Sequence, residues 1–244
     1  MAKTKQRSTR RYRSPPMRIG KFVARWIFLK PALKTQLTIH VHGRKNLSDI
    51  SHKQAFIAVS NHTSHLDTIL IMKELPWRLA RKISTASAAD FWFKNRIRSL
   101  PARILMNTFP VERGETNRHK GLASELLQQN IPLIIMPEGK RSRTGAMGEF
   151  KLGAAVFAVK HGVPIVPTAI VGSYEAWPPT AKLWRLGRPP VHISFGKPLL
   201  PKRGETVEKF NARLKRTITK LYDETARTYS MPTQAEMEVQ AKQK

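Results

Sequence analysis

Short apolar runs of strand length alternate with amphipathic stretches along most of the chain, and this alternation limits the possible fold more than any other feature. Short apolar runs bounded by turn residues are typical of buried strands, and apolar residues at helical spacing indicate helices. Strands are predicted at residues 37–43, 55–60, 81–87, 107–114, 131–139, 163–172 and 191–199, and helices at 63–75, 120–130, 152–162 and 206–229. This interleaving predicts an α/β fold: a single-domain sandwich with a mixed, mostly parallel sheet flanked by helices.

The chain divides by composition into four parts. Residues 1–16 are polar and basic and end in two prolines, which predicts a flexible arm. Residues 17–35 form a basic amphipathic stretch, and residues 36–230 hold the alternating pattern of the domain. Residues 231–244 are polar, so we expect a frayed tail there.

The stretch at 17–35 sets basic side chains between apolar ones, close to helical spacing. That composition is typical of a helix lying in a membrane interface, with Phe22, Trp26 and Phe28 among the side chains that would enter it. An ordinary surface helix that packs its apolar face on the domain is the alternative interpretation. Pro31 is expected to end or kink this helix.

The charge of the chain is strongly positive: 44 lysines and arginines stand against 16 acidic residues, a formal net charge of +28. Thirteen of the cations precede the first acidic residue, Asp49. Such a surface attracts polyanions, which include nucleic acid, anionic lipid headgroups and phosphorylated substrates. No nucleic-acid-binding motif is recognisable. The hypothesis that the chain binds nucleic acid is therefore limited to nonspecific phosphate contacts made by the basic arm.

The chain contains no cysteine, which excludes disulfides, thiolate zinc sites and cysteine nucleophiles. No apolar run approaches the roughly 20 residues that a membrane-spanning helix needs. No secretory signal peptide is evident, although an Arg-rich, acid-free N-terminus is also compatible with a mitochondrial transit peptide. Any association with a membrane is therefore expected to be peripheral and monotopic rather than integral.

A polar segment follows the second apolar run and contains His62, His65 and Asp67. Three interpretations are open. Asn61 or Ser64 can cap a helix, the histidines can form half of a metal site, or the carboxylate can orient a histidine that acts as a base.

Three further segments follow or form predicted strands, at whose ends α/β proteins gather their active sites. Arg113 follows one strand. Glu138 and Gly139 close the most apolar strand, and cations follow at once, which indicates an anion site on a glycine turn. A solvated basic loop is the alternative there. Pro164 and Pro167 stiffen another strand, and since proline belongs at a strand edge or start, that strand is predicted to border a cleft.

Taken together, four blocks of the sequence resemble the PlsC-type glycerolipid acyltransferases, a family that includes lysophosphatidic acid and glycerol-3-phosphate acyltransferases. The blocks are NHTSHLD, FPVER, PEGKRS and VPIVP, in that order, within residues 55–172. The resemblance implies a glycerol-3-phosphate acyltransferase-like fold, with His62 as general base and Asp67 as its partner. It also implies an acceptor phosphate site formed by Arg113, Glu138, Gly139, Lys140, Arg141 and Ser142. It further implies an acyl-donor cleft shaped by Pro164 and Pro167.

The resemblance further implies transfer of a fatty acyl group from acyl-CoA or acyl carrier protein, as co-substrate, to the free hydroxyl of 1-acyl-glycerol-3-phosphate, giving phosphatidic acid. Another lysolipid or glycerol-3-phosphate is the alternative acceptor, and a basic nucleic-acid-binding protein is the alternative of another class. Because a thioester is already activated, no metal and no cofactor is expected. The expected partners are an anionic membrane surface, on the cytoplasmic face, a lysophospholipid and the acyl donor, with no specific nucleic acid.

The sequence departs from the family pattern at Lys140, where a small residue such as threonine is common. The added charge bears on the choice of acceptor. His65 lies inside the first block but lacks the family spacing to Asp67, so we expect it to be structural. A metal hydrolase built on His62 and His65 is a more distant alternative.

Overall fold

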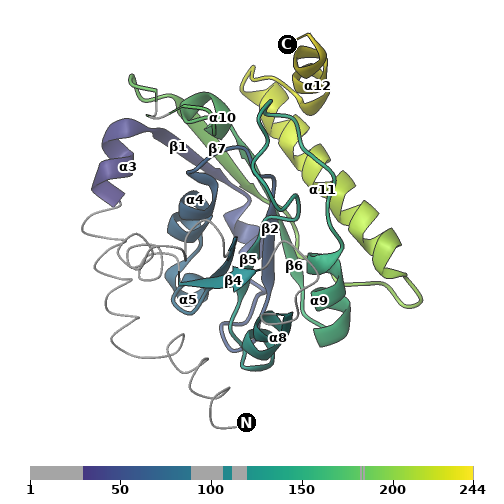
Figure 1. Ribbon diagram of the computed structural model, residues 1–244. Helices are drawn as coiled ribbons and strands as arrows, with labels where there is room; N and C mark the ends of the chain where they lie inside the picture. The colour runs from purple at the N-terminus through teal and green to yellow at the C-terminus, as the bar shows by residue number, and fades with distance from the viewer. Residues whose placement is uncertain (1–29, 89–106, 112–119, 182, 184, 244) are drawn as a thin grey trace.

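The computed structural model describes residues 30–88, 107–111, 120–181, 183 and 185–243. A seven-stranded sheet runs through the molecule in the order β1-β7-β6-β2-β5-β3-β4 (Figure 1). Every neighbouring pair is parallel except β6 and β7, which are antiparallel. The predicted mixed, mostly parallel sheet is therefore confirmed, with strands β1 (Thr38–His42), β2 (Ile57–Ser60), β3 (Ser84–Ala88), β4 (Thr108–Val111), β5 (Leu133–Ile135), β6 (Ile165–Val171) and β7 (Pro190–Phe195).

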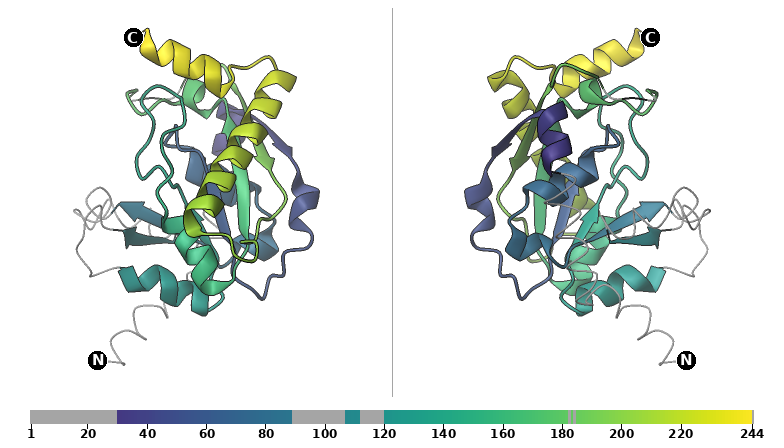
Figure 2. Two further views of the ribbon diagram at one scale, coloured as in Figure 1. Left: turned by 90° about the vertical axis from the view of Figure 1, so that its right-hand side faces the viewer. Right: turned by 90° about the vertical axis from the view of Figure 1, so that its left-hand side faces the viewer.

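Helices cover both faces of this sheet, as Figure 2 shows in its two views. On one face, apolar side chains of α8, α9 and α11 pack together with those of the central strands. On the other face, the core includes residues of α3, α4 and α5 and of a short 3-10 helix, η2. The helices are α3 (Lys30–Gln36), η2 (Arg44–Leu47), α4 (Asp67–Glu74), α5 (Trp77–Ala80), α8 (Lys120–Gln128), α9 (Gly153–His161), α10 (Ser173–Ala176), α11 (Val207–Thr228) and α12 (Gln234–Lys242).

The central strands are buried on both faces, which explains why their sequences read as continuous apolar runs rather than alternating ones. In β2, Ile57 and Val59 enter the core beneath α9 and α11, whereas Ala58 enters the core beneath α4. Two packed layers around one sheet form the sandwich predicted from the alternation of strands and helices.

The direction of the strands defines one edge of the sheet as the place for a site. The parallel strands β2, β3, β4, β5 and β6 end at the same edge. Because β7 is antiparallel to β6 and β1 is parallel to β7, both β7 and β1 begin at that edge. The residues that follow β2, β5 and β6 are thus brought together there.

Helix α11 is the strongest helical prediction and is confirmed. Its buried stripe includes Phe210, Leu214, Ile218 and Tyr222, at the spacing read from the sequence. The Thr206 side chain accepts a hydrogen bond from a backbone N–H of the first turn, so the helix begins where a capping residue stands.

The frayed tail expected at residues 231–244 is wrong for most of its length. Gln234–Lys242 form α12, whose N-terminus carries a reciprocal capping box between Thr233 and Glu236. Met237 and Gln234 are buried, and the Gln234 side chain accepts a hydrogen bond from the backbone N–H of Met147. Packing against the domain and the capping box keep this segment helical, although its composition is polar.

Proline was expected at a strand edge or start, and this holds for Pro164, which stands at the start of its strand, but not for Pro167, which lies inside a central strand. This strand is β6, which lies between β7 and β2 near the middle of the sheet, and both prolines are buried. Pro164 directly precedes the strand. Pro167 lies beside a bulge in the chain that follows β7. Thr168 pairs with Phe195 and Ile165 pairs with Leu199, so an advance of three residues along β6 corresponds to four residues along the paired segment. The missing proline N–H falls at this interruption of the ladder.

Lys30–Gln36 form α3, and Pro31 is the second residue described in it, so the predicted end or kink at Pro31 depends on residues that lie outside the described part of the chain. Leu33 is buried in the core under α4. The remainder of the predicted amphipathic helix, residues 17–29, and the arm at 1–16 lie outside the described residues. Within the described residues, no helix combines the length and the apolar character needed to cross a bilayer.

Candidate active site

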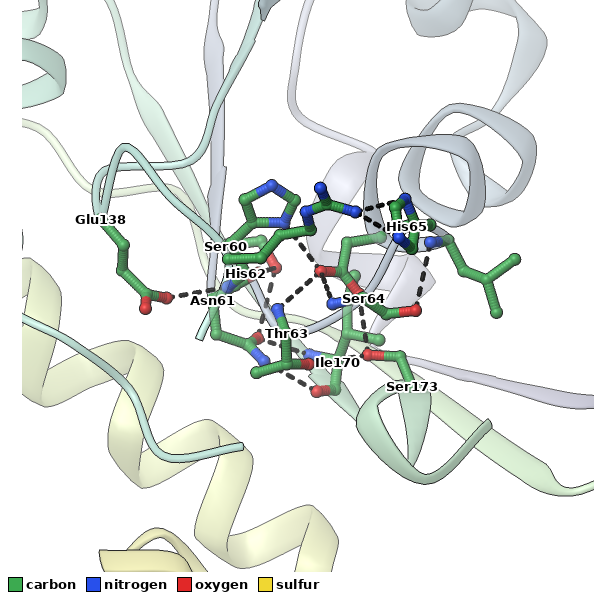
Figure 3. A network of polar contacts seen from close by, with 12 residues as sticks. Ser60, Asn61, His62, Thr63, Ser64, His65, Glu138, Ile170 and Ser173 are labelled. Atoms are coloured by element: carbon green, nitrogen blue, oxygen red, sulfur yellow. Dashed lines mark hydrogen bonds and ion pairs between the residues drawn. The ribbon is translucent and has the colours of Figure 1, made fainter. Parts of the chain in front are cut away.

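His62 and Asp67 meet directly after the carboxyl end of β2. Nδ1 of His62 lies 2.9 Å from Oδ2 of Asp67 (Figure 3). The predicted helix at 63–75 begins only at Asp67, because the chain first makes a turn that brings the two side chains together. The Asp67 side chain is fully buried, whereas the His62 side chain keeps 21% of its surface exposed.

The Asp67 carboxylate organises this turn. Its Oδ2 accepts the backbone N–H groups of Thr63 and Ser64, both at 2.8 Å, in addition to the His62 ring. Its Oδ1 accepts the hydroxyl hydrogen of Ser173 at 2.7 Å. An ionised carboxylate only accepts, so Nδ1 of His62 carries the hydrogen and Nε2 is left with a free lone pair. A partly exposed imidazole in that tautomer can act as a base.

Asn61 fastens the turn to the neighbouring strand. Its side-chain amide donates to the carbonyl of Ile170 and accepts from the N–H of Ile170, each at 2.9 Å. The side chain thus continues the hydrogen bonding between β2 and β6 beyond the last paired residue. Asn61 does not cap α4, which was one of the interpretations open from the sequence.

Glu138 supports His62 through the backbone. Its Oε1 accepts the His62 N–H at 2.8 Å, and its Oε2 accepts the Gly148 N–H at 2.9 Å. Burial raises the pKa of this carboxyl, although the two backbone hydrogen bonds act in the opposite direction. Since both oxygens accept backbone donors, Glu138 braces the turn that holds His62, and its predicted place in the acceptor phosphate site stays a prediction.

The loop after β5 also binds the other backbone group of His62. The N–H of Ser142 donates to the His62 carbonyl at 2.8 Å. The Ser142 hydroxyl accepts the N–H of Gly145 at 3.1 Å, which closes the turn in its own loop. Gly139 adopts φ +73°, a conformation that L side chains rarely take, and this permits the turn after Glu138.

Arg141 lies beside the histidine turn. Its guanidinium contacts the ring of His65, and that ring packs against Trp177 with a centroid distance of 4.8 Å. Burial and the Arg141 charge lower the pKa of His65 from its ordinary value. His65 was expected to be structural, and it contacts Arg141 on one side and Trp177 on the other; its role stays a prediction.

Four other site residues were predicted: Lys140, Arg113, Pro164 and Pro167. Lys140 is exposed next to Arg141, at the surface of the same loop. Arg113 lies outside the described residues, so its predicted role stays a prediction. Pro164 and Pro167 are buried within the sheet, and their predicted role in an acyl-donor cleft likewise stays a prediction.

Two further residues, Ser173 and Asn61, contact the site. Neither was predicted from the sequence to belong to it. Ser173 follows Gly172 at the carboxyl end of β6, the same kind of position that pointed to His62. That positional signal could have found Ser173. Asn61 was noted only as a possible cap, since its true partner, Ile170, is 109 residues away.

The site therefore combines a histidine held by a buried carboxylate with an arginine and a lysine on the adjacent loop. In the described residues, no group of three histidine, aspartate or glutamate side chains is arranged to hold a metal ion. A base beside cations can remove a proton from a hydroxyl group of an anionic molecule.

A comparison with protein families matches residues 38–171 to the family described as acyltransferase, more than half of the 244-residue chain. The chain belongs to the acyltransferase family. The match spans the turn that holds His62 and Asp67, the loop that holds Glu138 and Arg141, and all of β6.

Curated relatives of this acyltransferase carry a more specific name. The chain is 28% identical over 156 residues, 62% of its length, to a 1-acyl-sn-glycerol-3-phosphate acyltransferase of Cocos nucifera. The match covers 48% of that protein. The chain is 33% identical over 130 residues, half of its length, to the 1-acyl-sn-glycerol-3-phosphate acyltransferase alpha of Homo sapiens, and covers 42% of it. The chain spans about half the length of the curated relatives it matches.

A solved structure shares the acyltransferase fold. The crystal structure of the 1-acyl-sn-glycerophosphate acyltransferase PlsC from Thermotoga maritima superposes with a TM-score of 0.62. The likeness covers 82% of this chain and 81% of that one, at 24% sequence identity. At this identity the likeness supports the α/β fold, which the sheet order and the two helical layers already define.

Proposed function

We propose that this acyltransferase moves a fatty acyl group from a thioester donor, acyl-CoA or acyl carrier protein, to the free hydroxyl of 1-acyl-glycerol-3-phosphate, giving phosphatidic acid. The observation that carries the proposal is the contact between Nδ1 of His62 and Oδ2 of Asp67, 2.9 Å long, on an imidazole that keeps part of its surface exposed. The names of the relatives from Cocos nucifera and Homo sapiens support the choice of acceptor.

The chemistry needs one base. The acceptor hydroxyl gives its proton to Nε2 of His62 as its oxygen bonds to the thioester carbonyl carbon. The buried Asp67 carboxylate stabilises the imidazolium that forms. When the carbon–sulfur bond breaks, the thiolate takes up that proton, which restores His62 and releases the free thiol. In this scheme the acyl group passes directly from the thioester to the acceptor hydroxyl, and the proton passes from that hydroxyl to the thiol. No covalent enzyme intermediate is needed.

The acceptor in this scheme carries a phosphate, and the site offers cations for it. Arg141 lies on the loop that bonds to both backbone groups of His62, so its guanidinium is held at a fixed place relative to the base. A guanidinium binds phosphate as a planar fork. Lys140 adds an exposed ammonium beside it, and we retain Arg113 as a further predicted contact.

Membrane association follows from the nature of the substrates, since acceptor and product are lipids. The net charge of +28 favours an anionic bilayer surface. We propose that the enzyme works from the surface of the bilayer, with the predicted amphipathic stretch at 17–35 as one attachment.

An acyl-transfer assay on the purified full chain tests the proposal. Lysophosphatidic acid, other lysophospholipids and glycerol-3-phosphate are offered separately, each with acyl-CoA and with acyl carrier protein as donor. The proposal requires phosphatidic acid as the preferred product. Preference for a different acceptor would replace the substrate while keeping the reaction, and the absence of transfer to every acceptor would reject the activity.

A further inference from the structure

The loop between α10 and β7, residues 177–189, carries the two most exposed large apolar side chains of the described chain. Leu183 is 82% exposed and Leu186 is 76% exposed, against 55% for Val239, the next in order. Arg185 and Arg188 alternate with these leucines and are exposed too. We call these four residues the loop patch.

The beginning of this loop is bonded to the candidate active site. The hydroxyl of Ser64 donates to the carbonyl of Trp177 at 2.7 Å, and the Trp177 ring packs on His65. The N–H of Arg185 donates to the carbonyl of Ala176 at 2.7 Å, which closes the first part of the loop on itself. The loop patch is therefore held close to the turn that carries His62.

The end of the loop is bonded to Thr38, the first residue of β1. The N–H and the hydroxyl of Thr38 donate to the carbonyls of Pro189 and Arg188, each at 3.2 Å. Thr38 begins β1, directly after α3 and Leu37, and β1 starts at the active-site edge of the sheet. The loop patch and α3 thus lie at the same edge of the sheet, as the positions of α3, β1 and α10 in Figure 1 show.

We propose that the loop patch is a docking surface for an anionic lipid bilayer, with Leu183 and Leu186 entering the interface and Arg185 and Arg188 meeting the headgroups. This inference rests on the proposed function only in that the acceptor is a lipid. Apolar side chains interleaved with cations have the composition of an interfacial segment. The bonds of the loop to Ser64 and Thr38 would hold the bilayer against the active-site edge, so a lipid acceptor reaches His62 while its acyl chain stays in the membrane.

The test measures binding of the full chain to phosphatidylcholine vesicles with and without added phosphatidylglycerol. The variant L183S/L186S should bind the anionic vesicles at least about tenfold more weakly than the wild type, because leucine side chains lose their transfer into hydrocarbon. L200S is the matched control: Leu200 is 54% exposed, and its neighbour Leu199 pairs with Ile165 at the opposite edge of the sheet. It should bind as the wild type does.

A second variant, R185Q/R188Q, separates the two parts of the patch. It should lose most of the preference for phosphatidylglycerol while keeping its binding to neutral vesicles. Unchanged binding of both double variants would overturn the proposal, and so would an equal loss in L200S. If the wild type is a dimer that L183S/L186S converts to a monomer with vesicle binding intact, the patch binds a second copy of the chain and the proposal is wrong.

Acyl transfer to a detergent-dispersed acceptor keeps this inference distinct from the proposed function. L183S/L186S should retain wild-type transfer in detergent, since none of its replaced side chains takes part in the dyad or the cationic loop. Loss of transfer there would show that the patch acts on the site itself and would overturn the docking role. Absence of transfer by the wild type would reject the proposed function. The docking surface would then be tested by the vesicle-binding result alone.

Discussion

Ser173 donates its hydroxyl hydrogen to Oδ1 of Asp67 across 2.7 Å, although 106 residues separate the two in the sequence. The two side chains are fully buried. Ser173 also lies 3.0 Å from the hydroxyl of Thr63, in the turn between His62 and Asp67. The end of β6 is thereby joined to the carboxylate that holds the His62 imidazole, so the position of this ring depends on two strands.

Replacing Ser173 with alanine should lower kcat roughly 10- to 100-fold with little change in the acceptor KM. The reason is that a hydrogen bond to a charged group contributes about 1.5–3 kcal/mol and that its loss leaves Oδ1 of Asp67 buried without this donor. Steady-state kinetics measures the effect. Ser60→Ala, which removes an equally buried hydroxyl that bonds Asn61 instead, is the control and should stay near the wild-type kcat. Equal losses in both variants would refute the positioning role.

His62→Ala should lower kcat by about 10²–10⁴-fold, the usual cost of removing a positioned base. His65→Ala removes only the neighbour of Arg141 and Trp177, so it should act mainly through a higher acceptor KM. Measuring kcat and KM for both variants separates the two histidines. A kcat for His65→Ala as low as that of His62→Ala would show that the roles assigned to them are wrong.

Arg141→Ala should reduce kcat/KM for the phosphorylated acceptor about 10- to 100-fold, as expected for the loss of a charged hydrogen bond to phosphate. Arg141→Lys should recover only part of this, since an ammonium does not reproduce the planar fork. Arg203→Ala removes the same charge at an exposed position before α11 and should leave kcat/KM unchanged. Full recovery by lysine would mean that charge alone matters at residue 141.

Much of the fold could be predicted from local sequence, because its signals are local. The stripe of α11 is strictly periodic and is preceded by the capping residue Thr206. The continuous apolar runs of β2 and β6 identify strands buried on both faces. The boundary of α4 was misplaced because the Asp67 carboxylate binds the N–H groups of Thr63 and Ser64, a contact that local propensity does not contain.

The parts that could not be predicted depend on pairing between distant segments. Nothing near Pro167 indicates that its missing N–H faces a bulge next to β7, which is what admits a proline to a central strand. The bracing contact between Glu138 and His62 spans 76 residues. The first and third blocks do lie side by side, since Glu138 and Ser142 bond the two backbone groups of His62, but the sequence did not predict which groups meet.

Stability should fall as the pH drops below about 6.5, through His192. Burial and the nearby His40 and His42 lower its pKa from the ordinary 6.5 to about 4. Between these values the unfolded chain binds a proton at His192 that the folded chain does not, so acid favours unfolding. Urea unfolding should show a loss of about 2 kcal/mol from this group between pH 7 and pH 5.

The His192→Phe variant provides the matched comparison. Phenylalanine keeps a ring beside Tyr229, which stacks on His192 with a centroid distance of 3.9 Å, but takes up no proton. Its stability should therefore fall less between pH 7 and pH 5 than that of the wild type. His52→Ala, at an exposed histidine, should keep the wild-type slope. An unchanged slope in His192→Phe would exclude His192 as the source of the pH dependence.

The most direct test of the central claim follows a labelled acyl group. The purified full chain is mixed with lysophosphatidic acid and an isotopically labelled acyl thioester in detergent, and the lipid products are identified by mass spectrometry. The account predicts labelled phosphatidic acid and free thiol in equal amounts with the wild type, and about 10²–10⁴-fold slower formation with His62→Ala. Labelled phosphatidic acid formed as fast by His62→Ala as by the wild type would contradict it.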